Sequence, residues 1–326
     1  MKTNPKMHLL DVHSPSLAKL ATRNAFGEAL AEIGALDNRV VALSSDVSGS
    51  VQTAAFAEKF PARFFNVGVA EQNLAAVAAG LAYSGKTAFI GAFAIFSPGR
   101  NWEQVRTTIC LTNANVKIEG SHAGIEAGED GATHQALEDV AILRCLPNIT
   151  IVSPCDAGQA KKATHAAWKT PGPFYIRCTR GALPCFTTPE TPFELGKANL
   201  LCEGSDIAIV AAGATVFESL QAAAQLEKEG ISAAVLDMHT ISHPDAPALG
   251  KLARKCGCVV TVEDHSARGG LGGAVCETLS GAYPVRVRRL GMERFGESGK
   301  GSELLRKYGL EREGIARACR EEMGKR

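Results

Sequence analysis

The sequence has no Cys-x-x-Cys pair and no excess of charge of either sign. Its ten cysteines are scattered, and only Cys256 and Cys258 lie close together, so neither a zinc ribbon nor the disulfide framework of a secreted domain is predicted. The 35 basic residues are balanced by 34 acidic residues. A balanced chain does not attract nucleic acid or an anionic membrane by long-range charge. We therefore expect no nucleic-acid partner, and a charged metabolite has to be held by individually placed groups.

Long apolar runs are also missing. No run approaches the roughly 20 residues that span a bilayer, and residues 1–15 lack the apolar segment of a signal peptide. We expect a cytoplasmic protein with free thiols and no membrane partner. The chain of 326 residues is 45% hydrophobic and only 21% charged, which is enough for two packed domains.

Short apolar runs alternate with helical segments along the first half of the chain. Helical periodicity extends over residues 17–33, with Arg23 in the first turns. The apolar runs have the length of buried strands, and their alternation with helices predicts an α/β fold, a mostly parallel sheet covered by helices. The runs cover residues 40–43, 64–67, 87–92, 116–119, 149–152 and 174–176.

A proline-rich polar stretch at residues 187–192 divides the chain. Beyond it the alternation restarts, with strands predicted at residues 207–211, 233–238, 259–262 and 285–290 and helices at 215–229 and 245–255. We expect a tail at residues 1–16, a first domain at 17–187, a linker at 188–196 and a smaller second α/β domain at 197–326.

A carboxylate stands at the head of an apolar helix that begins near Glu71. The residues after Asn73 are apolar or small on every side, which predicts a buried helix. Glu71 then has two interpretations. The free N–H groups of the helix N-terminus satisfy its carboxylate, or burial poises the carboxyl to share or donate a proton at neutral pH.

Further polar and aromatic side chains follow the predicted strands of the first domain. In a parallel sheet, ligands bind beyond the carboxyl ends of the strands, where loops and helix N-termini converge. The sequence therefore predicts that these side chains share one edge of the sheet, which favours the chemical interpretation of Glu71. They are Asp46 and Ser50 after the first strand, Glu71 after the second, Phe93 and Phe96 after the third, and His122 after the fourth.

The densest polar loop covers residues 121–135 and has three interpretations. A divalent metal could use His122, Glu126, Asp130 and His134, but their spacing fits no compact zinc or calcium motif. The loop could also be solvated, with incidental histidines. A substrate site is favoured, with His122 and His134 as polarising donors and Asp130 as the acceptor for a hydroxyl.

Two other pairs of residues are candidates. Phe93 and Phe96 belong either to the core or to a slot for a flat heterocycle. Arg177 and Arg180 end another predicted strand, where they either meet a phosphate group or lie on the surface.

Taken together, the motifs resemble the second half of a transketolase, in order and at similar spacing, over nearly the whole chain after Leu17. The resemblance implies a pyrimidine-binding thiamine diphosphate domain followed by a transketolase C-terminal domain. The motifs of the first domain are Ala21-Thr22-Arg23, Ser45-Asp46, Val69-Ala70-Glu71-Gln72, Ser121-His122, residues 128–135 and Arg180-Gly181-Ala182-Leu183-Pro184.

The resemblance also implies thiamine diphosphate as the cofactor and a role for each motif residue. Glu71 would hydrogen-bond a nitrogen of the aminopyrimidine ring and, with His122 and His134, would take part in catalysis. The remaining roles are cofactor binding by Phe93, Phe96 and Asp46, and substrate binding by Arg23, Ser50, His122, Asp130, His134 and Arg180, with Arg23, Ser50 and Arg180 on the phosphate of a sugar phosphate.

Two departures from the family pattern stand out. Gly99 replaces a further aromatic residue of the pyrimidine wall, and the chain lacks the Gly-Asp-Gly motif with its downstream Asn. In the family that motif holds Mg²⁺ and the diphosphate, so we expect the metal ligands on a partner, the transketolase N-terminal subunit, and none on this chain. An α2β2 heterotetramer containing a homodimer of this chain is the implied assembly.

The implied activity is that of a transketolase, the transfer of a two-carbon ketol unit from a ketose phosphate to an aldose phosphate, as in pentose phosphate and carbohydrate metabolism. The alternatives are a transketolase for an unusual sulfonated or branched sugar, a chain like the synthase that joins pyruvate to glyceraldehyde 3-phosphate, a chain like a 2-oxo acid dehydrogenase β subunit, and a catalytically silent scaffold.

Overall fold

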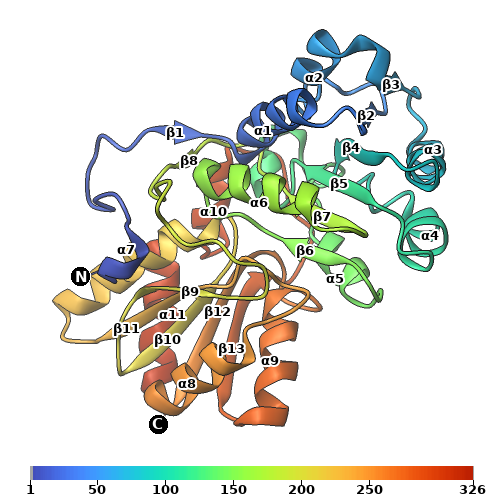
Figure 1. Ribbon diagram of the computed structural model, residues 1–326. Helices are drawn as coiled ribbons and strands as arrows, with labels where there is room; N and C mark the ends of the chain where they lie inside the picture. Colours follow the sequence, from blue (N-terminus) through green and yellow to red (C-terminus); the bar gives the residue numbers. More distant parts are fainter. Residues whose placement is uncertain (1–2, 326) are drawn as a thin grey trace.

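The computed structural model describes residues 3–325 and folds them around two large β-sheets, in addition to a small two-stranded sheet (Figure 1). Within these residues the first sheet has six strands in the order β3-β2-β4-β5-β7-β6, and every neighbouring pair is parallel. The central strands are buried on both faces, which explains their continuous apolar runs. The strands are β2 (Val40–Ser44), β3 (Phe64–Asn66), β4 (Thr87–Phe93), β5 (Val116–Ser121), β6 (Thr150–Val152) and β7 (Phe174–Arg177).

Helices cover both faces of this sheet. On one face α1 (Thr22–Leu36) packs beside α6 (Ala157–Lys169) over a cluster that includes Phe26 and Phe89. On the other face α3 (Glu71–Tyr83) and η3 (Val105–Cys110) pack through Leu74 and Ile109. The remaining helices of this part are α2 (Ala54–Lys59), η2 (Pro61–Arg63), α4 (Trp102–Gln104), η4 (Ile125–Asp130) and α5 (Asp139–Arg144).

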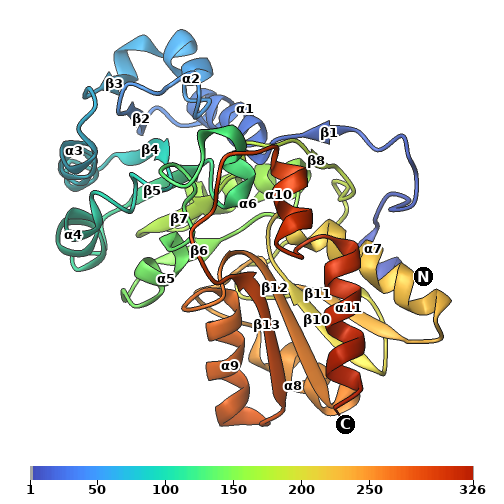
Figure 2. The same cartoon turned by 180° about the vertical axis from the view of Figure 1, so that it is seen from behind.

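The second sheet has the order β13-β12-β10-β11-β9 within the described residues, parallel except for β9, which pairs antiparallel to β11. Figure 2 shows α11 lying along this sheet and α10 reaching toward the first sheet. The strands are β9 (Asn199–Cys202), β10 (Ile207–Ala211), β11 (Ala233–Asp237), β12 (Cys258–Ser266) and β13 (Arg286–Met292), and the helices are α7 (Thr215–Lys228), α8 (Ala246–Cys256), α9 (Leu271–Ala282), α10 (Gly301–Lys307) and α11 (Arg312–Met323). The predicted α/β class, with two mostly parallel sheets covered by helices, is confirmed.

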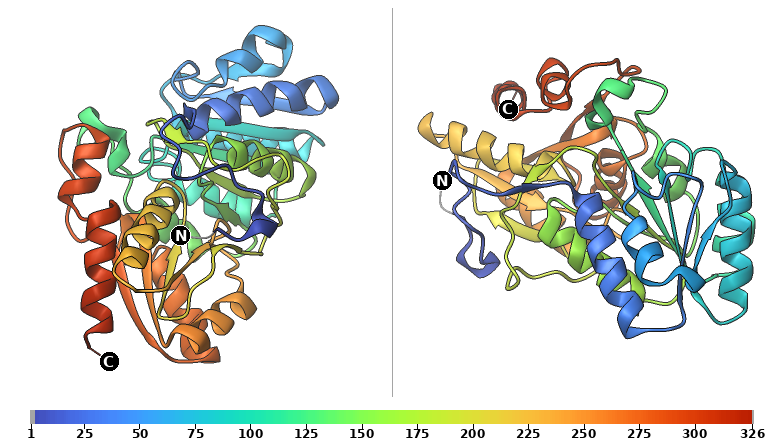
Figure 3. Two further views of the ribbon diagram at one scale, coloured as in Figure 1. Left: turned by 90° about the vertical axis from the view of Figure 1, so that its left-hand side faces the viewer. Right: turned by 90° about the horizontal axis from the view of Figure 1, so that it is seen from above.

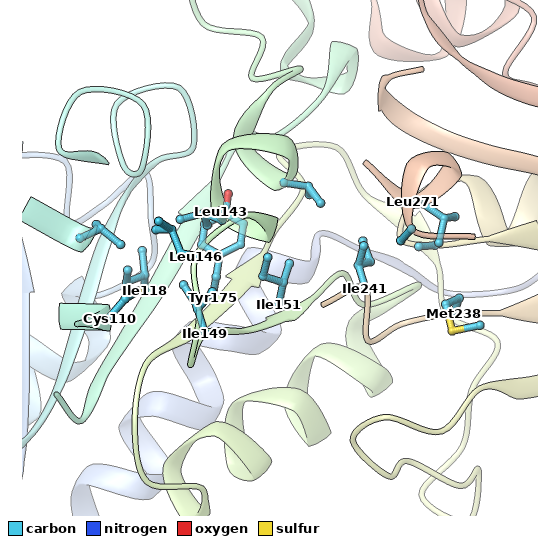
Figure 4. Close-up of a cluster of buried hydrophobic side chains, with 14 of the residues drawn as sticks. Cys110, Ile118, Leu143, Leu146, Ile149, Ile151, Tyr175, Met238, Ile241 and Leu271 are labelled. Atoms are coloured by element: carbon cyan, nitrogen blue, oxygen red, sulfur yellow. The ribbon is translucent and has the colours of Figure 1, made fainter. Parts of the chain in front are cut away.

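Each large sheet with its covering helices is here called a domain, the first and the second in chain order. The two domains share a hydrophobic core. Figure 4 shows this core continuing from Tyr175 and Ile151 of the first domain to Ile241 and Leu271 of the second. The backbone N–H of Ile241 also donates to the carbonyl of Ile151 at 2.9 Å. Because the buried cluster is continuous, the two domains support each other's position.

The N-terminal segment lies against the second domain (Figure 3, left), although the first domain follows it in sequence. It contains η1 (Pro5–Met7), and the side chain and backbone N–H groups of Asn4 donate to carbonyls at Leu200 and Leu201. The helix predicted over residues 17–33 begins only at Thr22, so its predicted start is wrong. The backbone before it is extended because β1 (Lys19–Leu20) pairs with β8 (Leu183–Pro184).

The prediction that the helix after Glu71 is buried all round is also wrong. Leu74 and Ala78 of α3 are buried, whereas Ala76 and Gly80 on its outer side are exposed. Nearby Val69 is 70% exposed. The apolar sequence therefore covers a core on one side only and leaves a weakly polar surface on the other.

None of the helices between residues 3 and 325 combines the length and the apolarity that a membrane span requires.

Candidate active site

The predicted polar and aromatic residues meet at the carboxyl edge of the first sheet. Strands β2, β3, β4 and β5 end there at Ser44, Asn66, Phe93 and Ser121. Because all these strands are parallel neighbours, the loops that follow them lie side by side. The sheet topology thus brings Glu71, the two phenylalanines and His122 into one region.

Glu71 is the first residue of α3, and it is 3% exposed. Within the described chain its carboxylate accepts one hydrogen bond, from Nη1 of Arg100 to Oε2 at 3.1 Å. Asn101 Nδ2 donates to the backbone carbonyl of Glu71 at 3.0 Å. The helix N–H groups therefore do not satisfy the carboxylate, and Oε1 keeps an acceptor site. Arg100 was not among the sequence candidates, because only the fold brings it to Glu71.

Phe93 and Phe96 form a wall next to Glu71. Their rings are nearly parallel, with centroids 6.2 Å apart and an angle of 17°. The His122 ring stacks on Phe93 at 3.9 Å, and the His134 ring meets the edge of Phe96 at 5.5 Å. Arg100 lies over the other part of this wall, 4.8 Å from the Phe96 centroid. Both phenylalanines are half-buried, so they line the site and do not belong to the core.

His122 is buried and held by two polar neighbours. Its Nε2 lies 3.0 Å from Nη1 of Arg23, and its Nδ1 lies 3.0 Å from Oγ of Ser121. Since a guanidinium only donates, Nε2 must accept and Nδ1 carries the proton. Burial lowers the pKa of His122 to about 3, and the charges of Arg23 and Arg180 add to this effect. His122 is therefore a neutral imidazole at physiological pH.

We expect His122 to stay neutral from pH 8 down to about pH 5. Its folded-state pKa lies below the ordinary value of 6.5, so the stability it contributes is present above that value and is lost as the pH falls toward 3. NMR of the chain with isotope-labelled histidine, with the signal assigned by His122→Gln, measures this. Protonation of His122 above pH 5.5 would contradict the accepting role of Nε2.

A group of buried polar atoms lies beneath Arg23. Both carboxyl oxygens of Glu119, Nε of Arg23 and Oγ1 of Thr53 are buried without a hydrogen-bond partner among the described residues. A Cβ on Gly91 would lie 2.9 Å from Cγ2 of Val51 and 3.2 Å from Oε2 of Glu119, so a larger residue there would crowd this group. Burial raises the pKa of Glu119 well above its usual value. Glu119, which sequence patterns did not single out, thus places a buried carboxyl close enough to Arg23 for the two charges to interact.

Asp46 and Ser50 lie at the rim of the site. Asp46 and Asn66 exchange two hydrogen bonds, of 3.0 and 2.9 Å, which tie the end of β2 to the end of β3. The carbonyl of Ser50 accepts from Nη1 of Arg23 at 2.8 Å. Both Asp46 and Ser50 are exposed, so their side chains can be reached from outside.

The loop after β5 carries His134 and the exposed Asp130, and Arg180 reaches it from the segment after β7. Nη1 of Arg180 donates to the carbonyl of Ala127 at 2.7 Å and to Oε2 of Glu129 at 2.8 Å. The two arginines considered for phosphate separate here. Arg177 is buried against Asp139, at 2.8 Å, and does not reach the site.

In the described part of the chain, no three His, Cys, Asp or Glu side chains are placed to share a metal ion. Glu126, one of the four candidates, lies next to Gly181 and Gly301, and one of its oxygens is buried. Burial raises the pKa of Glu126 to about 8, and the nearby Asp264 carboxylate adds to the shift.

Both parts of the chain match known protein families. Residues 18–185 match the transketolase pyrimidine-binding domain, and residues 196–315 match the transketolase C-terminal domain. The chain is 44% identical over 307 residues to a putative transketolase C-terminal section of Methanocaldococcus jannaschii, covering 93% of this chain and 96% of that protein. It is 41% identical over 304 residues to a subunit of the apulose-4-phosphate transketolase of Phocaeicola vulgatus, covering 93% and 97% of the two chains.

A solved structure described as a split gene transketolase, inactive beta4 tetramer, superimposes with a TM-score of 0.86. It is 43% identical to this chain and is covered over 99% of its length, while 94% of this chain is covered. The matched domains, the identities and this superposition agree. The chain belongs to the transketolase family of thiamine-diphosphate-dependent enzymes, of which it carries the pyrimidine-binding and C-terminal domains.

Proposed function

We propose that this chain is the C-terminal subunit of a divided transketolase, which transfers a two-carbon ketol unit from a ketose phosphate to an aldose phosphate with thiamine diphosphate as cofactor. The observation that carries the proposal is the single cluster of Glu71, the Phe93 and Phe96 wall and the two histidines at one sheet edge. We assign the cofactor and substrate residues to the first domain, residues 17–187, and separate it by the linker 188–196 from the second, residues 197–326.

The residues present fit the aminopyrimidine part of the cofactor. Oε1 of Glu71 has no hydrogen-bond partner among the described residues, so it can meet a ring nitrogen. The half-buried faces of Phe93 and Phe96 suit a flat heterocycle, and Asp46 would contribute to cofactor binding from the rim of the site. When bound, thiamine diphosphate supplies the carbon nucleophile that attacks the donor carbonyl. Glu71 would hold and exchange a proton at the ring nitrogen.

The donor sugar would be bound by residues on the other side of the aromatic wall. His122 and His134 would contact its carbonyl end, and the exposed Asp130 would accept a hydrogen bond from a hydroxyl. Arg23, Ser50 and Arg180 would hold its phosphate, with the two guanidiniums as charged donors. Arg180 donates to the Glu129 carboxylate and to the carbonyl of Ala127 in this structure. The phosphate oxygens would replace these two acceptors.

Magnesium and the diphosphate would be held by an N-terminal subunit with the Gly-Asp-Gly and Asn motif, which this sequence lacks. The exposed, weakly polar side of α3 supports a partner at this position, next to Glu71. It includes Ala76 and Gly80, with Val69, Tyr83 and Leu111 between 58% and 74% exposed around it. We propose an α2β2 heterotetramer in which two copies of this chain form a homodimer.

Reconstitution tests the function. The purified chain is mixed with the protein of a neighbouring reading frame that carries the missing motif, together with thiamine diphosphate and Mg²⁺. We expect ketol transfer from xylulose 5-phosphate to ribose 5-phosphate, measured by product formation. No turnover with any sugar phosphate would overturn the proposal.

A transketolase for a less common sugar is the second candidate, and the 41% identity to a subunit named for apulose 4-phosphate favours it. A panel of ketose donors, including branched and sulfonated sugars, decides between the two by their kcat/KM values. The donor with the highest kcat/KM identifies the substrate class.

Replacing Arg180 by alanine should raise the KM for a phosphorylated donor about tenfold, because charge-assisted hydrogen bonds to phosphate are lost. The affinity for thiamine diphosphate should stay unchanged, because Arg180 is assigned to the substrate phosphate and not to the cofactor. Arg306→Ala, at an exposed arginine of α10, is the matched control. An equal KM effect in both variants would contradict the phosphate role of Arg180.

A further inference from the structure

The loop that carries Asp130 and His134 belongs to the first domain but is held by the second. We propose that Asp264 of β12 is a positioning residue for this loop, residues 122–135, here called the substrate loop. In this proposal, which rests on the transketolase activity proposed above, the second domain contributes to the reaction by fixing the substrate loop.

Asp264 makes the first connection. It is 2% exposed, and its Oδ1 accepts from the backbone N–H of Ile125 at 2.9 Å, while Oδ2 accepts from that of Glu126 at 3.4 Å. Gly124 precedes these residues with φ +80°, and a Cβ there would collide with the Asp264 carboxylate. The start of the substrate loop is therefore shaped to receive this one side chain.

Gln135 makes the second connection at the other end of the loop. Its Nε2 donates to the carbonyl of Glu297 in the second domain at 2.9 Å and lies 3.3 Å from the carbonyls of Ile125 and Gly128. A Cβ on Gly131 would lie 2.6 Å from Oγ of Ser298. Figure 2 shows the segment after β13 leaving the second domain toward the first. The loop is thus joined to the second domain near both of its ends.

The substrate loop needs such anchors because its own structure is sparse. It contains one short helix, η4, and three glycines with positive φ, at Gly124, Gly128 and Gly131. Glycine-rich backbone loses the most conformational freedom when it is ordered. A donor sugar needs Asp130 and His134 at fixed distances, and small displacements of positioning groups cost much of the rate. The buried carboxylate of Asp264 supplies that order before the substrate arrives.

Glu263, the neighbour of Asp264 on β12, provides a matched control. It is 4% exposed and also accepts two backbone N–H groups, from Leu271 at 2.6 Å and Gly272 at 2.8 Å. Those donors belong to α9 of its own domain. Both residues are buried carboxylates that cap backbone N–H groups, but only Asp264 reaches the substrate loop.

The first arm of the experiment is amide hydrogen exchange of the full chain, compared between Asp264→Asn and Glu263→Gln. In Asp264→Asn we expect roughly tenfold faster exchange in residues 124–131, since one acceptor oxygen of a charged hydrogen bond is lost. In Glu263→Gln the faster exchange should be confined to residues 270–275. Unchanged exchange of residues 124–131 in Asp264→Asn would overturn the anchoring.

The second arm is kinetics of the reconstituted complex. Asp264→Asn should raise the donor KM, and this fold-increase should be roughly ten times the fold-decrease in kcat. Glu263→Gln should leave the donor KM unchanged. Faster amide hydrogen exchange in the substrate loop with an unchanged donor KM would overturn the positioning role. If Asp264→Asn does not fold, Gln135→Leu removes the second connection and should give the same two effects. Absence of turnover by the unsubstituted complex would overturn the proposed function, while the exchange arm still decides the anchoring.

Discussion

Replacing Glu71 by alanine should lower kcat for ketol transfer by the reconstituted complex roughly 10³-fold, the size expected when a group that exchanges a proton is removed. Glu71 is buried at the head of α3, beside the Phe93 and Phe96 wall, and Oε1 keeps an acceptor site. Glu71→Gln keeps the shape but cannot exchange the proton, so it should show a loss of similar size. Steady-state kinetics with saturating thiamine diphosphate measures both.

The control for Glu71 is Glu103→Gln, which changes an exposed acid in the first turn of α4 and should leave kcat unaltered. Circular dichroism of each variant shows whether the fold is retained. Full activity of Glu71→Ala would remove the proposed mechanism and would favour the alternative of a catalytically silent subunit.

The largest effect on stability is expected at Asp139. Its carboxylate accepts from Nε of Arg177 at 2.8 Å and from the hydroxyl of Tyr175 at 2.7 Å, all of them buried. Nη2 of Arg177 also donates to the carbonyl of Asp264 at 2.8 Å, so the pair lies at the junction of the domains. Asp139→Ala leaves the guanidinium buried without its carboxylate and should cost about 3–5 kcal/mol in the free energy of unfolding.

Guanidinium denaturation measures this loss, and the exposed pair of Glu229 and Arg320 is the control. These two side chains lie 2.9 Å apart with solvent around them, so Glu229→Ala should cost about 0–1 kcal/mol. Equal losses in the two variants would contradict the assigned role of burial.

The Asp139 contribution should also depend on pH. Burial opposes ionisation of Asp139, but the charges of Arg177 and His265 and the hydrogen bonds from Arg177 and Tyr175 together outweigh it and hold the pKa of Asp139 below its usual value. The stabilisation is therefore present above the ordinary Asp pKa of about 3.9 and is lost as the pH falls through the lower folded-state pKa. Unfolding curves taken from pH 7 down to about pH 2 would show it as a difference between the original chain and Asp139→Ala that shrinks below the ordinary Asp pKa.

The α/β class and most strands follow from the sequence because buried parallel strands read as continuous apolar runs. The strand predicted at residues 207–211 is β10 (Ile207–Ala211), and the parallel edge rule puts Glu71 and Phe93 at the same edge of the sheet. Short pairings such as β1 with β8 and the antiparallel β9 escape the patterns. Two to four residues carry too little periodicity, and a distant strand decides their conformation.

Most site residues were indicated by the strand-end rule and by the dense polar loop, and the resemblance to transketolases assigned their roles, but neither predicted their surroundings. Glu119 and Arg100 lie next to the predicted residues but have no local sequence signal, since each acquires its role only from a neighbour distant in the chain. The outer side of α3 shows the same limit. Its apolar residues indicate that it packs against other protein atoms. Periodicity cannot tell whether those atoms belong to the core of this chain or to another chain.

By itself, the sequence determined the two α/β domains, the shared sheet edge and the motifs that indicate a thiamine diphosphate site. Only the tertiary structure decided that Arg177 is buried with Asp139 while Arg180, three residues later, reaches the substrate loop, and that Asp264 connects the second domain to that loop. The reason is physical. Periodicity reports which side of its own element a residue faces, whereas charge pairing and anchoring depend on distances between elements that only packing sets.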